Sequence, residues 1–171
     1  MISCLTDRNS PHRLQGRWRA HLHVIALALP LFGHIPAIAA MESVWQADIL
    51  FHVNAARAAH NLAPLQWNAR LATAAEMHAT DLQSCRRLAH EGCDGSDLRL
   101  RAQRVGYTFR RLSENLALCP CDAAAVVQAW LNSDGHRRNL LDPNVSEMGA
   151  DTRADAMDLR RQQWVLVMGR Q

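Results

Sequence analysis

The spacing of apolar residues constrains the fold of this chain more than any other sequence feature, because it changes from a helical to a strand pattern along the chain. Apolar residues recur at helical spacing in the segments 41–61 and 69–84. Near the C-terminus, 147–152 and 163–169 are typical of strands, and the polar run between them predicts a hairpin loop. Helices that precede a terminal antiparallel pair indicate one α+β domain built in layers.

Shorter segments complete the predicted elements. Helical spacing returns in 97–105 and 123–132, 107–118 is predicted to be extended, and the stretch after Gly135 to be irregular. Polar residues able to cap a helix N-terminus precede the later helices: Asn68, Ser96 and Asp122. Three residues in these patterned segments are predicted to lie in the core: Trp67, His78 and Trp130. We expect His78 to be hydrogen-bonded there rather than to act as a ligand.

The charge balance limits the partners of the domain. All 19 basic residues other than histidine are arginines, and from residue 40 onward 15 arginines face 15 acidic residues. Nucleic-acid-binding domains carry a basic surplus on their folded part, so we expect no nucleic-acid partner. With 49% hydrophobic residues the chain can close one core, and we expect a monomer.

A group of arginines between residues 99 and 111 has two interpretations. Its members are Arg99, Arg101, Arg104, Arg110 and Arg111. They could form an anion-binding patch, or they could lie on a solvated face and pair with local acids. The neutral total charge favours the solvated face.

The first 39 residues are typical of an export signal. Three arginines within residues 13–19 precede an apolar run at 24–32, and the small-x-small sequence 37–39 would allow cleavage before Ala40. The run is about half of the ~20 residues that span a bilayer. We therefore expect a signal peptide at 1–39 and a secreted or periplasmic domain at 40–171, without a transmembrane segment in the mature chain. An uncut leader that tethers the domain is the alternative.

Export changes the interpretation of the cysteines. The mature chain keeps four: Cys85, Cys93, Cys119 and Cys121. An even number in an oxidising compartment predicts two disulfides, and we favour Cys85–Cys93 and Cys119–Cys121. One zinc ion held by four thiolates is the alternative, although structural zinc sites prefer C-x2-4-C pairs.

Five sequence blocks occur in order between about residues 45 and 169. They are Asn54-x-x-Arg57 with Leu62-x-Pro64-Leu65-x-Trp67-Asn68, Leu71-Ala72-x-Ala74-Ala75-x-x-His78, His90 with Asp94-Gly95-Ser96, Gly106-Tyr107 with Ser113-Glu114-Asn115, and Trp130 to Leu141. Glu147-x-Gly149 and Trp164-Val165 follow them. Together these blocks resemble the bacterial form of the CAP superfamily (cysteine-rich secretory protein, antigen 5 and pathogenesis-related 1), also called the SCP-like domain.

The resemblance implies an α-β-α sandwich in which helical layers enclose a small antiparallel sheet. It also implies a surface cleft lined by two histidines and two acidic residues. The matching positions are His90, Glu114 and His136. Animal and plant members have a glutamate three residues after the tryptophan of the fourth helix, where this chain, like many bacterial members, has Ser133. That departure weakens any mechanism that needs two carboxylates.

The cleft residues are compatible with structural, metal-binding and catalytic roles. His90 and His136 could hold a divalent metal such as zinc, and Glu114 could orient an imidazole or activate water in a metal-assisted hydrolase such as a peptidase. Members of the family are mostly known as secreted binding or signalling proteins. The resemblance therefore favours a non-enzymatic module that binds an extracellular lipid, wall component or protein, with no cofactor assigned. A structural envelope protein with a vestigial cleft is a third hypothesis.

Overall fold

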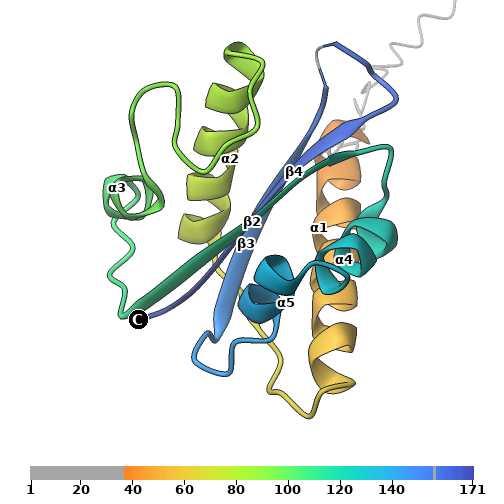
Figure 1. Cartoon of the computed structure of the whole chain (residues 1–171), viewed down its shortest axis with the longest axis vertical. Coiled ribbons are helices and arrows are strands. Elements are labelled where there is room, and N and C mark those ends of the chain that lie inside the picture. Colours follow the sequence, from red (N-terminus) through yellow and green to blue (C-terminus); the bar gives the residue numbers. More distant parts are fainter. Residues whose placement is uncertain (1–36, 156) are drawn as a thin grey trace, which may run out of the picture. The chain divides into compact units, whose positions relative to one another are not determined.

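A computed structural model describes residues 37–155 and 157–171 of the chain (Figure 1). In chain order its elements are α1 (Ala37–Ala58), β1 (Gln66–Trp67), α2 (Ala69–Ser84), α3 (Leu98–Arg104), β2 (Arg111–Cys119), α4 (Ala123–Leu131), α5 (Asp134–Leu140), β3 (Glu147–Ala154) and β4 (Gln162–Arg170). The predicted signal peptide lies outside the described residues, except that 37–39 form the start of α1.

The four strands form one sheet in the order β1-β3-β4-β2. The long strand β4 is antiparallel to both of its neighbours, so that Val167 lies between Glu114 of β2 and Gly149 of β3. The two-residue strand β1 runs parallel to β3 and makes the sheet mixed. The antiparallel sheet implied by the family resemblance is thus confirmed, with one short parallel edge strand added.

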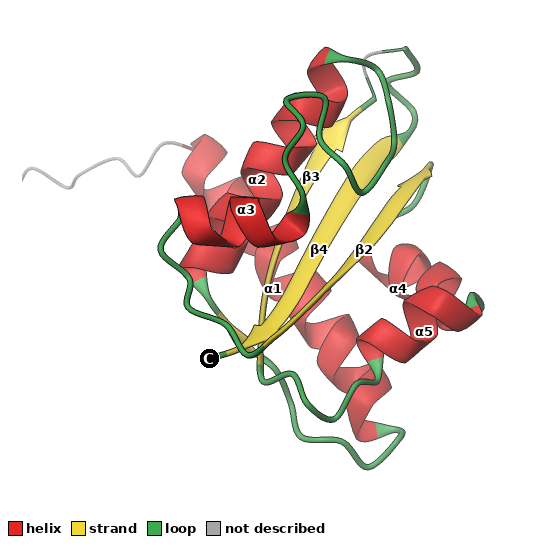
Figure 2. Ribbon diagram, turned by 60° about the vertical axis from the view of Figure 1, so that its left-hand side comes forward, coloured by secondary structure: helices red, strands yellow, loops and turns green. Residues whose placement is uncertain are grey.

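Helices cover both faces of the sheet and complete the α-β-α sandwich (Figure 2). Because successive side chains of a strand point to opposite faces, β4 contributes to two hydrophobic cores. Trp164, Leu166 and Met168 pack with residues of α1, α4 and α5. Val165 and Val167 pack instead with residues of α2 and α3.

The side chains expected in the interior lie there. Trp130 and His78 are fully buried, and Trp67 packs against the core on the α1 side of the sheet. Asn68 and Asp122 cap α2 and α4 as predicted: Asn68 accepts hydrogen bonds from two backbone N–H groups of the first turn, and Asp122 accepts one.

Two predicted helix ends are wrong, and one helix was not predicted. Helix α1 ends at Ala58 rather than at residue 61, where Asn61 adopts a positive φ of 57°. Asp97, not Ser96, caps α3 by accepting a 2.7 Å hydrogen bond from the N–H of Leu100. The stretch expected to be irregular contains α5, which has seven residues and too few apolar side chains to show a helical period.

Both predicted disulfides are present. Cys85 is bonded to Cys93, and Cys119 is bonded to Cys121. The pairing uses all four thiols and leaves none for the alternative zinc site. Among the described residues, no helix combines the length and the hydropathy needed to cross a bilayer.

Gly149 allows α2 to lie directly against the sheet. A Cβ atom at this position would overlap the backbone of Leu71 and Ala72. We expect Gly149→Ala to lower the free energy of unfolding by about 3 kcal/mol, because neither backbone can move without repacking the layer. Urea unfolding monitored by circular dichroism measures the change.

Gly135→Ala is the matched control, since the nearest atom to a Cβ there is 4.0 Å away. It is expected to leave stability unchanged or to raise it by about 0.5–1 kcal/mol, because alanine is the better helix former. Equal losses in the two variants would contradict this account of the contact.

Candidate functional site

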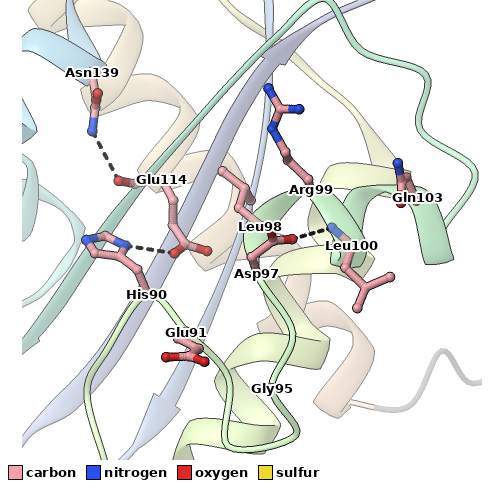
Figure 3. Close-up of a pocket in the computed structure, with 10 residues that line it drawn as sticks. All are labelled: His90, Glu91, Gly95, Asp97, Leu98, Arg99, Leu100, Gln103, Glu114 and Asn139. Atoms are coloured by element: carbon pink, nitrogen blue, oxygen red, sulfur yellow. Dashed lines mark hydrogen bonds and ion pairs between the residues drawn. The ribbon is translucent and has the colours of Figure 1, made fainter.

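An open hollow of about 860 Å³ lies beside α3 (Figure 3). It is lined by His90, Glu91, Gly95, Asp97, Leu98, Arg99, Leu100, Gln103, Glu114 and Asn139. The residues come from the loop after α2, from α3, from the middle of β2 and from α5. Most of the side chains are polar or charged, and two of the predicted cleft residues, His90 and Glu114, are among them.

Glu114 is the buried centre of this site. Only 2% of its side chain is exposed, and both carboxylate oxygens are bonded. Oε1 lies 2.9 Å from Nδ1 of His90, and Oε2 accepts a 2.8 Å hydrogen bond from Arg101. The structure therefore brings together a histidine and the glutamate that lie 24 residues apart.

Arg101 holds Glu114 from the side of α3. Its guanidinium is 1% exposed and also donates to two backbone carbonyls, those of Ser96 at 2.9 Å and His90 at 3.2 Å. The prediction of a solvated arginine face is wrong for this residue. It holds for Arg104, which forms an exposed pair with Asp94.

His78 approaches the same carboxylate from α2. Its Nε2 donates a 3.0 Å hydrogen bond to the carbonyl of Ala89 and lies 3.8 Å from Oε1 of Glu114. Burial lowers the pKa of His78 and outweighs the attraction of the carboxylate. The predicted role as a hydrogen-bonded core histidine is confirmed.

The pKa values of the two histidines His90 and His136 are shifted in opposite directions. The hydrogen bond to Glu114 raises the pKa of His90, although the ring is partly desolvated. Burial lowers the pKa of His136, and the charge of His90 lowers it further. At a pH near 6.5 the charged form is thus favoured at His90 and the neutral form at His136.

Helix α5 is attached to the sheet by amide side chains that the sequence reasoning did not single out as functional. Asn115 donates to the carbonyl of His136 at 3.0 Å, and Asn139 donates to the carbonyl of Glu114 at 3.1 Å.

Two predicted cleft residues do not line the hollow. His136 is half-buried on α5, and Ser133 is the N-cap of that helix without a side-chain capping bond.

The described residues do not place three zinc-ligand atoms close together around His90 and His136. Arg101 and His90 occupy the carboxylate of Glu114, which leaves only imidazole nitrogens as ligands. Among the described residues, no group of three histidine, cysteine or carboxylate atoms within 4.8 Å of one another includes His90 or His136. Zinc in proteins takes three or four such ligands. Within the part of the chain that the structure describes, the one cluster of that kind contains Cys85 and Cys93, which are joined in a disulfide.

The sandwich and the paired histidine and glutamate define a CAP-type domain, and sequence comparison agrees. Residues 50–155 match the model of the cysteine-rich secretory protein (CAP) family, and the chain belongs to this family.

Two curated relatives come from Bacillus subtilis strain 168. The uncharacterized membrane protein YlbC is 30% identical over 109 residues, which are 64% of this chain and 32% of the relative. The uncharacterized protein YkwD is 28% identical over 107 residues, 63% of this chain and 42% of the relative. The chain therefore matches less than half the length of either protein.

Solved structures share the fold. An extracellular protein with an SCP domain from Bacillus anthracis has a TM-score of 0.68 and 28% identity, over 75% of this chain and 41% of that one. An outer surface protein of Borrelia burgdorferi has a TM-score of 0.65 and 22% identity, over 80% and 96% of the two chains. The second similarity concerns the fold alone.

Replacing His90 tests the coupling between the two histidines. Because the pKa of His90 is raised above its ordinary 6.5, its bond to Glu114 stabilises the fold below that pH and is lost as the pH rises through the folded-state pKa. The stability difference between the wild type and His90→Gln should therefore be larger at pH 5.5 than at pH 8.5. In NMR titrations of the variant, the pKa of His136 should move upward towards 6.5.

His52→Gln on α1, outside the hollow, is the control and should leave the titration of His136 unchanged. An unchanged His136 titration in His90→Gln would contradict the proximity of the two rings.

Proposed function

We propose that this CAP domain is an exported binding module that holds a polar envelope ligand in the hollow without hydrolysing it. The observation that carries the proposal is the buried Glu114 carboxylate, bonded on both oxygens. A general base must accept a proton from water, and a metal ligand must offer a lone pair. A carboxylate neutralised by buried Arg101 is suited to neither task. This arrangement supports a binding role over the metal-assisted peptidase.

The lining of the hollow favours a wall component over a lipid. Acyl chains are held by apolar walls, and only Leu98 and Leu100 contribute large apolar side chains here. Arg99, Gln103 and Asn139 instead offer donors and acceptors that match sugar hydroxyls and peptide amides. Glycan strands with attached stem peptides present both kinds of group.

Two further observations support action outside the cytoplasm. Disulfides form and persist in oxidising compartments, and this domain contains two of them. The similar structure from Bacillus anthracis is an extracellular protein. With the predicted leader, these observations favour a secreted or periplasmic domain.

Titration of the full chain with soluble peptidoglycan fragments tests the proposal. We expect NMR shift changes to concentrate on backbone amides around Arg99 and Gln103. Arg99→Ala should weaken binding about 10-fold, the effect of losing one charge-assisted hydrogen bond. Arg137→Ala is the matched control, because Arg137 lies on α5 outside the hollow, next to His60, and should bind as the wild type does.

Two outcomes would contradict the proposal. One is cleavage of the fragments by the wild type that is lost in Glu114→Gln. The other is binding equally affected by Arg99→Ala and Arg137→Ala, which would place the ligand elsewhere.

Addition of zinc is expected to leave the melting temperature unchanged. A ligand stabilises a protein only when it binds the folded state, and we expect no zinc to bind here.

A further inference from the structure

We propose that Cys119 and Cys121 form a redox-active disulfide that oxidises dithiols in exported polypeptides. The pair lies at the end of β2, in the connection to α4 that runs beside α1 (Figure 1). Both cysteines are half-buried against the core on the α1 side of the sheet, Pro120 between them is exposed, and Cys121 lines an open hollow. Surface-accessible disulfides are the ones that exchange readily with incoming thiols.

The turn around this disulfide is ordered by other interactions. Cys119 is already paired with Gln162 in the sheet. On the other side, the carbonyl of Cys121 accepts a hydrogen bond from the indole of Trp164, and Asp122 caps α4. Since the stabilisation by a cross-link grows with the length of the loop it closes, a C-x-C disulfide contributes little to the fold. It can therefore open without unfolding the domain.

The other disulfide has the features of a structural cross-link. Cys85–Cys93 closes a longer loop between α2 and α3, with a separation of eight residues. Asp81 anchors that loop by accepting a 2.5 Å hydrogen bond from the N–H of Cys93. The loop carries His90 to its bond with Glu114, so its opening would disturb the first hollow. The chain thus contains an internal reference for the exchange experiment.

A second hollow of about 460 Å³ lies against the proposed exchange site, with Pro120 and Cys121 in its wall. Trp45 and Trp164 line it and meet edge to face, with ring centroids 6.2 Å apart. Asp48, Asp122 and Arg160 supply charged groups of both signs around them. An aromatic surface beside a disulfide suits an extended polypeptide with an apolar side chain next to its cysteine.

The exchange has two balanced steps. A substrate thiolate attacks Sγ of Cys121, which lines the hollow, so that a mixed disulfide forms and Cys119 leaves as a thiolate. The second substrate thiolate then attacks the substrate sulfur of the mixed disulfide and releases Cys121. Two electrons pass from the substrate dithiol to the cysteine pair, and the two substrate protons end on Cys119 and Cys121. The substrate leaves as a disulfide.

Equilibration of the full oxidised chain in glutathione buffers measures the first requirement. Alkylation and peptide mass analysis then report each cysteine pair separately within one molecule. We expect Cys119–Cys121 to be half-reduced at a ratio of squared reduced glutathione to oxidised glutathione at least 100-fold smaller than Cys85–Cys93 requires. Reduction of both pairs at the same ratio, or of Cys85–Cys93 first, would overturn the proposal.

The second requirement is transfer to a substrate. A reduced dithiol peptide with leucine beside its cysteines should be oxidised without oxygen, one disulfide per chain. Cys119→Ser/Cys121→Ser should abolish this reaction, whereas the matched control Cys85→Ser/Cys93→Ser should retain it. Asp48→Arg, which places a larger side chain of opposite charge in the second hollow, should slow the peptide reaction more than tenfold and the reaction with the smaller glutathione less. Peptide oxidation that persists in Cys119→Ser/Cys121→Ser would overturn the assignment.

Discussion

Glu114 projects from the middle of β2 into the space beneath α3, where an unpaired carboxylate would lose several kcal/mol of hydration. Arg101 compensates for that loss with a buried guanidinium 2.8 Å away. The same guanidinium also binds backbone carbonyls of the preceding loop, including that of His90. One ion pair therefore fixes strand, loop and short helix together. The hollow exists because these three segments meet at this point.

The pair also decides what the hollow can do. His90 approaches the carboxylate through Nδ1, so its ring is oriented at the rim with 64% of the side chain exposed. His136 is not among the lining residues and sits on a helix held by backbone-directed amides from Asn115 and Asn139. An oriented, exposed imidazole beside a neutralised carboxylate is suited to recognition. The proposed binding role rests on this arrangement, and the proposed thiol exchange uses a separate surface.

Much of the architecture could be predicted because it follows from local periodicity. The alternation in β4 places Trp164 and Val165 in different cores, and Asn68 and Asp122 cap helices by interactions within one turn. Strand β1 escaped prediction because two residues show no period. Arg101 was misassigned because charge patterning groups it with its exposed sequence neighbours, whereas its partner is fixed only by the packing of α3 on β2. The meeting of His90 and Glu114 followed from the family resemblance, since spacing alone does not reveal a contact across 24 residues.

A double-mutant cycle on the buried pair tests the central claim most directly. The free energy of unfolding is measured for the wild type, Arg101→Met, Glu114→Leu and the double variant. If Glu114 is a neutralised structural carboxylate, the single Arg101→Met change leaves a buried charge uncompensated and costs about 3–5 kcal/mol, whereas the double variant is more stable than that single variant. Losses that add to within about 0.5 kcal/mol would show that the two groups do not depend on each other. Glu114 would then be free to act as a base, which contradicts its role as a neutralised structural carboxylate.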